Sequence, residues 1–491
     1  ASEIIYAGKG RVVKQTGDRR SRKYIITPTD SQAPRLKKKK FRNTRQVLTP
    51  SPNLTFEHPF TKKTSTLKII DIAGSGFSVA EEADNAVLLP GLLIPKLELN
   101  FASSIKTRCS AQVVYKNSLP TAGSAKQVKS GLALIDMHPT DHLKLLSLLY
   151  QAANDNSYLC NPVDLDDLWE FFFETGFIYP DKYVFFHQNK ETIKATYKKL
   201  YTENHDIARH FIYQVNGRIL GHMAMIRFYE NSWLIHHHAA RKADFTRAGL
   251  VVLNQIGRYL NDSHSLKSSK MNYVFCYFRP ENKFPARVFG GSARHIDNPG
   301  GCSMDSFAYL HYSRIPCLET KLPPPWHLAK TDAGDLLSLR RFYAQRSGGL
   351  MLKALELEPG SVEMPELRDR YNRAGLRRSR LLFSLKRNTD LIAIFILNIS
   401  DIGLNMSELT NCMTAIVLEP DNLPGEIFQS ALACQAKYFK PNTIPVLLYP
   451  ETYAKATAIN QEKAYTLWTL NMTHTDHYFR YMRRLLKRFD R

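Results

Sequence analysis

The chain has 491 residues, 44% of them hydrophobic and 23% charged, a globular composition at a length that predicts about two to four domains. Its formal charge of +22 favours anionic partners such as nucleotides, nucleic acid, anionic lipid or acidic polysaccharide, but no RNP-type or zinc-finger motif supports nucleic acid. The seven cysteines are scattered without a C-x-x-C pair, and no apolar stretch approaches the length of a membrane span. These patterns argue against a disulfide framework, a structural zinc site and a transmembrane segment, and with no visible signal peptide we expect a cytoplasmic protein.

A basic segment opens the chain. Its first 45 residues carry fourteen Lys and Arg against three acidic residues. Residues 1–35 are predicted to be a basic arm or linker with one strand-like piece, Gly10–Lys14. The run from Arg35 to Arg45 has the highest charge density, which alone is typical of a solvated face, a disordered arm or a nucleic-acid patch.

The next segment predicts a ligand-binding turn between two strands. Leu67–Asp71 is rich in β-branched residues, and Phe77–Val79 resumes an alternating pattern. Between them, Gly74 and Gly76 permit positive φ and a close approach of the backbone to a ligand. An acidic side chain at such a turn can accept hydrogen bonds from guanine, while arginine forks fit phosphate or the O6/N7 edge of guanine. We therefore expect a site for a small, guanine-containing, doubly phosphorylated ligand.

The turn resembles one hallmark of the PilZ domain, the motif [D/N]-x-S-x-x-G after the second strand. Asp71, Ala73 and Gly76 match this motif, with Ala in place of Ser. The missing hydroxyl removes one hydrogen bond to a ligand, worth about 1 kcal/mol.

The basic run resembles the other hallmark of that family, R-x-x-x-R before the first strand. Arg42 and Arg45 are three residues apart rather than four, whereas Lys38 and Arg42 have the four-residue spacing. The resemblance implies a bacterial signalling protein that binds cyclic di-GMP. The residues it assigns to the ligand are Lys38, Arg42, Arg45, Asp71, Ala73 and Gly76.

Further strands complete the small barrel that this resemblance implies. They are predicted at Leu89–Gly91, Leu97–Phe101, Ala111–Tyr115 and Gly131–Asp136. With the two strands around the turn they make an all-β, six-stranded PilZ-like domain over residues 36–140. Domains of this family pass the signal to an attached domain, so we expect the rest of the chain to be the output.

From residue 141 the pattern is mixed α/β. A hairpin is predicted at Asn216-Gly217, the strongest short signal for a two-residue turn. The other predicted elements are helices at Asp141–Tyr150, Asp166–Phe173 and Thr246–Leu260, and strands at Phe211–Val215, Ile219–Phe228, Trp233–Ala240 and Met271–Phe278. Three antiparallel strands, a helix and a further strand make an α/β sandwich.

After a linker at Pro323–Pro325 the same order recurs. The predicted elements are strands at Leu381–Lys386, Leu391–Asn398 and Cys412–Leu418, a helix at Glu426–Ala436 and a strand at Ile444–Tyr449. This order resembles the GNAT acyltransferase fold twice in tandem, as in Fem-type aminoacyl transferases. The resemblance implies two α/β domains, residues 141–325 and 326–491, that transfer an acyl or aminoacyl group from a donor such as acyl-CoA to a protein or small-molecule acceptor.

The helix start at which that family binds the acyl-CoA pyrophosphate is incomplete in both blocks. The family signature is [Q/R]-x-x-G-x-[G/A], which places the anion on backbone N–H groups of a helix N-terminus. Arg241–Gly249 supplies basic residues and one glycine, and Leu423–Glu426 supplies an acidic residue that would repel a pyrophosphate. The first block is therefore the candidate catalytic copy, and the second is expected to be structural.

A histidine triplet ends the third strand of the first block. On a regular strand His236 and His238 share one face and His237 lies on the other. The triplet is open to three interpretations: structural histidines, a base for an amine, or part of a metal site without an assigned third ligand. Tyr277 ends the next strand, where such folds place a proton donor, although core packing is the alternative. We take His238 and Tyr277 as the candidate catalytic residues.

Two other functions remain open. The chain could be a non-catalytic cyclic di-GMP receptor whose degenerate GNAT-like domains bind another protein. It could also bind nucleic acid or an anionic surface through its net charge. Near the C-terminus, His474, Asp476 and His477 suit either a metal site or, with Thr475 or Asp476 as N-cap, the start of an amphipathic helix.

Overall fold

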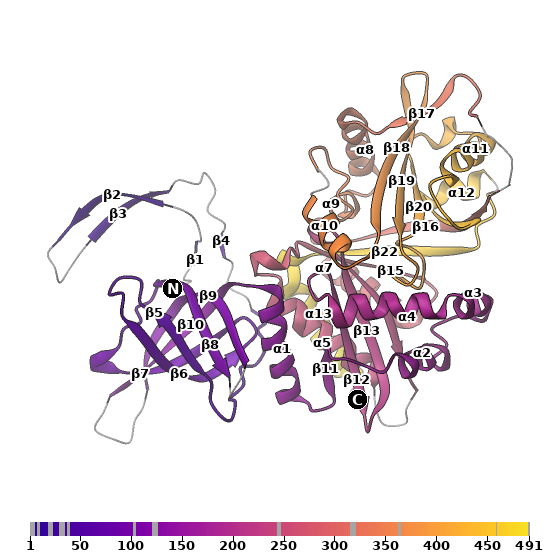
Figure 1. Cartoon of the computed structure of the whole chain (residues 1–491). Coiled ribbons are helices and arrows are strands. Elements are labelled where there is room, and N and C mark those ends of the chain that lie inside the picture. Colours follow the sequence, from indigo (N-terminus) through magenta and orange to yellow (C-terminus); the bar gives the residue numbers. More distant parts are fainter. Residues whose placement is uncertain are drawn as a thin grey trace. The chain divides into compact units, whose positions relative to one another are not determined.

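The computed structural model describes residues 5–6, 10–17, 23–28, 35–36, 40–101, 105–119, 126–242, 247–314, 321–361, 365–457 and 459–489 (Figure 1). The chain divides into two compact units, Ala1–Arg42 and Asn43–Arg491. In the first unit, two antiparallel strand pairs are described, β1 (Ile5–Tyr6) with β4 (Arg35–Leu36) and β2 (Gly10–Thr16) with β3 (Lys23–Pro28).

The second unit begins with a closed antiparallel barrel of six strands, as the sequence predicts. The strands are β5 (Asn53–Glu57), β6 (Thr64–Ala73), β7 (Gly76–Glu82), β8 (Leu93–Phe101), β9 (Ile105–Leu119) and β10 (Gln127–Met137), closed in the order β10-β7-β6-β5-β8-β9. Leu54, Phe77, Leu99 and Leu132 are among the fully buried side chains of its core. Leu89–Gly91 is not a strand but a turn in which Gly91 has φ of 90°. The sixth strand is β5, whose alternation is too short to stand out in the sequence.

The rest of the second unit is built on one 12-stranded mixed sheet. Its order is β11-β12-β13-β14-β15-β22-β16-β21-β20-β19-β18-β17. The strands are β11 (Ser157–Leu159), β12 (Ala208–Val215), β13 (Arg218–Tyr229), β14 (Ser232–Ala240), β15 (Tyr273–Phe278), β16 (Cys302–Ser313), β17 (Trp326–Lys330), β18 (Arg378–Arg387), β19 (Asp390–Ser400), β20 (Cys412–Val417), β21 (Thr443–Tyr449) and β22 (Lys463–Asn471).

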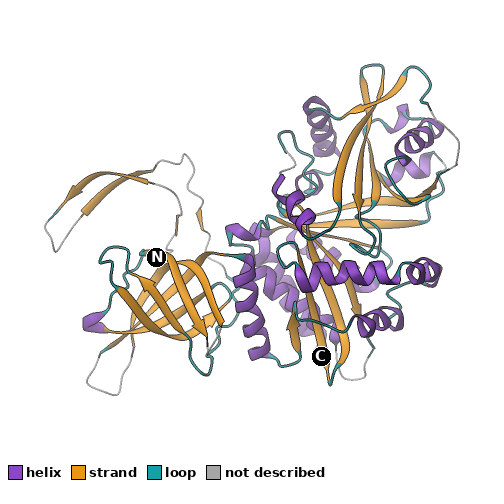
Figure 2. Ribbon diagram, in the orientation of Figure 1, coloured by secondary structure: helices purple, strands orange, loops and turns teal. Residues whose placement is uncertain are grey.

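Helices flank this sheet (Figure 2). They are α1 (Pro139–Ala153), α2 (Leu165–Glu174), α3 (Tyr183–Gln188), α4 (Lys190–Lys198), α5 (Ala248–Ser263), α6 (Lys283–Pro285), α7 (Gly291–Ile296), α8 (Ala333–Arg346), α9 (Met351–Ala354), α10 (Pro365–Arg373), α11 (Gly425–Ala436), α12 (Glu451–Ala456) and α13 (Thr475–Phe489). Within the described segments, no helix has the length and apolar content that crossing a membrane requires.

Local sequence signals explain where several of these elements begin and end. Asn216 and Gly217 both have positive φ, 49° and 78°, as a two-residue hairpin turn between β12 and β13 requires. The Asp164 side chain accepts hydrogen bonds from two backbone N–H groups at the start of α2. The helix expected near Asp476 begins at Thr475.

Strands of the two expected α/β halves alternate within one sheet. β22, close to the C-terminus, pairs antiparallel with both β15 and β16, so a strand from the second half lies between two strands from the first. β16 pairs in turn with β21 of the second half. The domain boundaries at residues 140 and 325 stay predictions, but the α/β part is continuous through one sheet rather than two independent sandwiches.

Candidate functional site

The first candidate site surrounds Asp71 on the barrel. Arg45 Nη1 lies 3.0 Å from Asp71 Oδ1, and Lys129 Nζ lies 2.6 Å from Oδ2. The buried Ser78 hydroxyl donates to Oδ1 at 2.6 Å. Arg45 also donates to the Tyr115 hydroxyl at 3.3 Å. One carboxylate therefore holds two cations from different parts of the chain at one place on the barrel.

These groups keep Asp71 ionised. Partial burial raises its pKa, but the hydrogen bonds from Lys129 and Ser78 and the charge of Arg45 outweigh burial, so the pKa is lowered below its usual value. The side chains of Arg45 and Lys129 remain 27% and 26% exposed. The two cations can therefore reach an anionic ligand without leaving the barrel.

The sequence predicts that Gly74 and Gly76 allow positive φ at the turn. In the structure they instead allow close packing of the turn against its neighbours. Neither Gly74 nor Gly76 is among the positive-φ glycines of the chain. A Cβ at Gly76 would lie 2.4 Å from the backbone oxygen of Leu132 in the neighbouring strand. Ala73, which pairs with Gly76 across the turn, is buried.

The structure brings together four of the six predicted nucleotide-site residues, Arg45, Asp71, Ala73 and Gly76. Arg45 contacts Asp71 directly, and Gly76 lies on the strand that follows the same turn. Lys38 lies outside the described residues, and Arg42 is exposed at the end of the first unit. Lys129 belongs to neither sequence motif, yet it lies beside Asp71. Only the pairing of β10 with β7 and β9 reveals it, because Lys129 is far from either motif along the chain.

The second candidate site is a cavity of about 730 Å³ at the ends of β14 and β15. These parallel strands pair only from Ser232–Leu234 to Tyr273–Phe275 and then part. The cavity follows this parting, and both His238 and Tyr277 line it. In the second half, the equivalent parallel strands β20 and β21 pair over four residues each.

The charged side chains that line the cavity are cationic, although Lys182 pairs with Glu408 and Arg279 with Glu281. Among the described residues that line it, five are Lys or Arg and none is Asp or Glu. The five are Lys182, Lys242, Arg279, Lys283 and Lys463. Residues of the second half contribute as well, since Asn405, Met406 and Tyr465 also line the cavity. A site assembled in this way favours an anionic ligand with an apolar portion.

His238 and Tyr277 have protonation states suited to proton transfer. Burial lowers the pKa of His238, and its Nε2 lies 3.1 Å from the Gly249 carbonyl oxygen. Nε2 therefore carries the proton and donates it, which leaves Nδ1 with its lone pair. Burial raises the pKa of Tyr277 well above its usual value, so its hydroxyl keeps its proton. The pair offers one acceptor and one donor in a single cavity.

His236 and His237 do not follow the expected alternation of faces. His237 has φ of 54°, and the pairing of β14 with β13 shifts register here. This β-bulge places the rings of His236 and His237 with centroids only 3.9 Å apart. Both side chains are buried.

Burial keeps His222 and His237 neutral, and a closed hydrogen-bond chain through Tyr197 fixes their tautomers. The Met406 N–H donates to His237 Nε2 at 2.9 Å, so His237 Nδ1 donates to the Tyr197 hydroxyl at 3.2 Å. That hydroxyl lies 3.3 Å from His222 Nε2, and His222 Nδ1 donates to the His237 carbonyl at 3.0 Å. Burial lowers the pKa of His222 to about 4. No group of three or more His, Cys, Asp or Glu that could hold a metal occurs in the described part of the chain.

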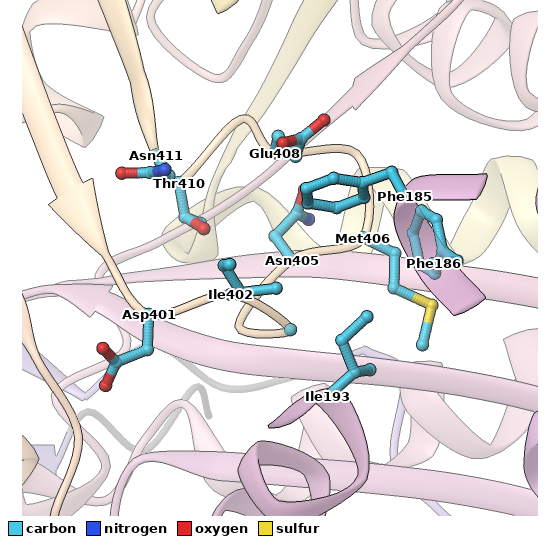
Figure 3. Close-up of a pocket in the computed structure, with 11 residues that line it drawn as sticks. Phe185, Phe186, Ile193, Asp401, Ile402, Asn405, Met406, Glu408, Thr410 and Asn411 are labelled. Carbon is cyan, nitrogen blue, oxygen red and sulfur yellow. The ribbon is translucent and has the colours of Figure 1, made fainter. Parts of the chain in front are cut away.

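The loop between β19 and β20 forms one wall of this region. Figure 3 shows Asn405 and Met406 of the loop beside Phe185 and Phe186 of α3. Asn405 Nδ2 lies 3.1 Å from His236 Nδ1. The pocket around the loop has a volume of only about 10 Å³, about the space of one water molecule. This small pocket is therefore packing between the two halves, whereas Asn405 and Met406 of the loop also line the larger cavity.

Comparisons with known proteins assign no family. No family model matches the chain, and no curated protein matches it. Among solved structures, the PilZ domain of YcgR from Escherichia coli with c-di-GMP is 15% identical, with a TM-score of 0.22, and the match covers 24% of this chain and 93% of that one. A Drosophila protein (11% identity, TM-score 0.34) and a presumed acetyltransferase from Thermoplasma acidophilum (9%, TM-score 0.29) each match over 63% of this chain, covering 97% and 98% of their own. Similarities at these identities and TM-scores do not assign an activity.

Proposed function

We propose that the chain is a cyclic di-GMP effector whose barrel binds the nucleotide and regulates a transferase in the α/β part. The observation that carries the proposal is the ionised Asp71 held between Arg45 and Lys129 on a closed barrel. A phosphate can replace the carboxylate as the partner of the two cations. The freed carboxylate can then accept hydrogen bonds from the guanine edge.

Lys38, Arg42, Ala73 and Gly76 complete the proposed nucleotide site. Lys38 and Arg42 supply further cations from the basic run, as the sequence resemblance implies. Gly76 has no side chain, which lets the backbone of the turn pack closely against β10. Ala73 occupies the position where the motif has Ser. Cyclic di-GMP carries two phosphates, which suits a site with several cations.

The proposed transfer chemistry takes place in the cavity at β14 and β15. The acceptor amine attacks the carbonyl carbon of a thioester such as acyl-CoA, and the carbon–sulfur bond breaks. His238 Nδ1 takes the proton that the amine loses, and the Tyr277 hydroxyl gives a proton to the leaving thiolate. Lys242, Lys283 and Lys463 would hold the phosphates of the donor, because Lys182 and Arg279 already pair with Glu408 and Glu281.

One observation favours the alternative of a non-catalytic receptor. β20 and β21 stay paired in the second half, and Glu426 stands in the first turn of α11 where a pyrophosphate would have to bind. If the first half has also lost its donor site, the α/β part would serve only to bind another protein. Thermal-shift measurements with a series of acyl-CoAs separate the two. A raised unfolding temperature with at least one donor supports the transferase, and no shift with any supports the receptor.

Calorimetric titration of the intact chain with cyclic di-GMP tests the nucleotide proposal. We expect saturable heat that is lost in Asp71→Ala and Arg45→Ala, because each change removes a member of the charged site. The same titration with Arg218→Ala, an exposed residue in the hairpin of the first half, is the control and should match the unchanged protein.

A further inference from the structure

The turn of the nucleotide site is seated directly on helices α1 and α5 of the α/β part. The buried His142 of α1 donates from Nε2 to the Gly74 carbonyl at 2.9 Å. A Cβ at Gly74 would lie 2.3 Å from Leu146 of α1 and 2.6 Å from the carboxylate of Asp262 in α5. The turn therefore has no free space in which to move without moving these helices.

The segment that carries Arg45 is attached to the same two helices. On one side of Arg45, the Asn43 amide donates to the Arg258 carbonyl at 3.0 Å and to Asp262 Oδ2 at 2.7 Å, both in α5. On the other side, the Gln46 amide donates to the Leu149 carbonyl of α1 at 2.9 Å. Any rearrangement of Arg45 around a bound phosphate acts on these attachments.

The opposite end of α5 borders the cavity. Gly249, in its first turn, lines the cavity and accepts the hydrogen bond from His238. Ala248 lies so close to β13 that a Cβ at Gly221 would be 2.9 Å from its carbonyl oxygen. The 16 residues of α5 span about 24 Å as one continuous helix. One rigid element thus touches the nucleotide site at its C-terminal end and the candidate proton acceptor at its N-terminal end.

We propose that α5 couples the two sites, so that nucleotide binding at the barrel shifts the first turn of α5 and with it His238 and the cavity. The proposal rests on the proposed function, since it needs cyclic di-GMP to bind at Arg45 and Asp71. The coupling is reciprocal: a ligand in the cavity changes the affinity for the nucleotide by the same factor, about 5- to 150-fold for typical coupling energies.

Hydrogen exchange of the full chain with and without saturating cyclic di-GMP tests the coupling. The amides of residues 249–253 in α5 are expected to change their exchange rate when nucleotide binds. Helix α11 of the second half, which stands in the corresponding place, serves as the internal reference and should not change. Binding without any change in α5 would overturn the coupling and leave the proposed nucleotide function intact.

Two variants of the attachment sharpen the test. Asn43→Ala removes the bonds to α5, and Gln46→Ala removes a matched bond to α1. We expect both to bind cyclic di-GMP in calorimetry, but Asn43→Ala to show a smaller α5 response than Gln46→Ala, since the contact of Gly74 with Asp262 still joins the site to α5. A full response in Asn43→Ala would overturn the route through Asn43. If the unchanged protein gives no heat with cyclic di-GMP, the proposed function fails and the coupling fails with it, so calorimetry tells the two failures apart.

Discussion

Among individual residues, ion pairs with Asp71 position the two cations of the candidate nucleotide site, Arg45 and Lys129. Asp71 pairs with both Arg45 and Lys129 and offsets one of their two positive charges, and Ser78 fixes the orientation of its carboxylate. The sequence identifies Asp71 and Arg45 because both belong to recognisable motifs. It could not identify Lys129, whose place beside Asp71 results from strand pairing across the barrel.

Lys129→Met tests whether the second cation takes part in binding. Hydrogen bonds to charged groups contribute about 1.5–3 kcal/mol, so the affinity for cyclic di-GMP should fall by about tenfold or more. Lys116→Met, on the neighbouring strand β9, is the matched control, because its ammonium donates to the Leu88 carbonyl instead. Equal affinities of the two variants in calorimetry would remove Lys129 from the site.

Gly76→Ala tests the packing role of the turn glycine. The added Cβ would meet the Leu132 carbonyl at 2.4 Å, and backbone on both sides cannot give way cheaply. Overpacking of this kind costs about 1–3 kcal/mol, so the unfolding temperature of the barrel should fall. Gly300→Ala is the control, since its nearest neighbour is the Asn298 side chain at 3.4 Å. A Gly76→Ala protein as stable as the control variant would contradict the packing argument.

At the scale of elements, the bulge in β14 decides what the histidine triplet does. Periodicity treats a strand as regular and therefore predicts that His236 and His238 share a face. The positive φ of His237 breaks that rule, and both His236 and His237 then contact the loop of Asn405 and Met406. The Asn216-Gly217 hairpin was predictable because its turn chemistry is local.

The buried histidines predict a loss of stability in acid. In the folded chain burial lowers the pKa of His236 to about 3 and that of His222 to about 4, whereas in the unfolded chain a histidine has a pKa near 6.5. Below pH ~6.5 the unfolded chain therefore binds protons that the folded chain does not, and stability falls steadily towards pH ~4. Urea midpoints measured across this range should show the decline.

His222→Gln checks the origin of that decline. The amide keeps a donor and an acceptor but cannot titrate, so the urea midpoint should depend less steeply on pH. His327→Gln removes an exposed histidine and should leave the slope unchanged. Equal slopes in all three proteins would show that the buried histidines do not drive the acid sensitivity.

At the scale of the whole molecule, strand exchange joins the two α/β halves. The recurring order of strands and helices was visible in the sequence because each element has its own periodicity. The position of β22 between β15 and β16 was not, because a strand's pattern shows which face is buried and not which distant strand it pairs with. Asn405 and Tyr465 of the second half also line the cavity, which the pattern of the sequence could not predict because they are far from β14 and β15 along the chain.

The shared sheet predicts that the first α/β half cannot fold alone. A chain of residues 43–325 lacks β22 and α13, so β15 and β16 lose their common partner and the apolar face under Tyr478 and Met482 is exposed. This fragment should lack a cooperative thermal transition of its α/β part in circular dichroism. Co-expression with residues 326–491 should restore it. A cooperative α/β transition in the isolated fragment would contradict the account.

Calorimetric titration of the intact chain with cyclic di-GMP decides whether the barrel is a nucleotide receptor. We expect saturable binding to the intact chain, weakened by Lys129→Met and lost with Asp71→Ala, while both variants keep the folded barrel by circular dichroism. We also expect weaker binding of GTP, which lacks the second guanine. No heat with cyclic di-GMP, or equal heat in the folded Asp71→Ala variant, would contradict the assignment of the barrel as a nucleotide receptor.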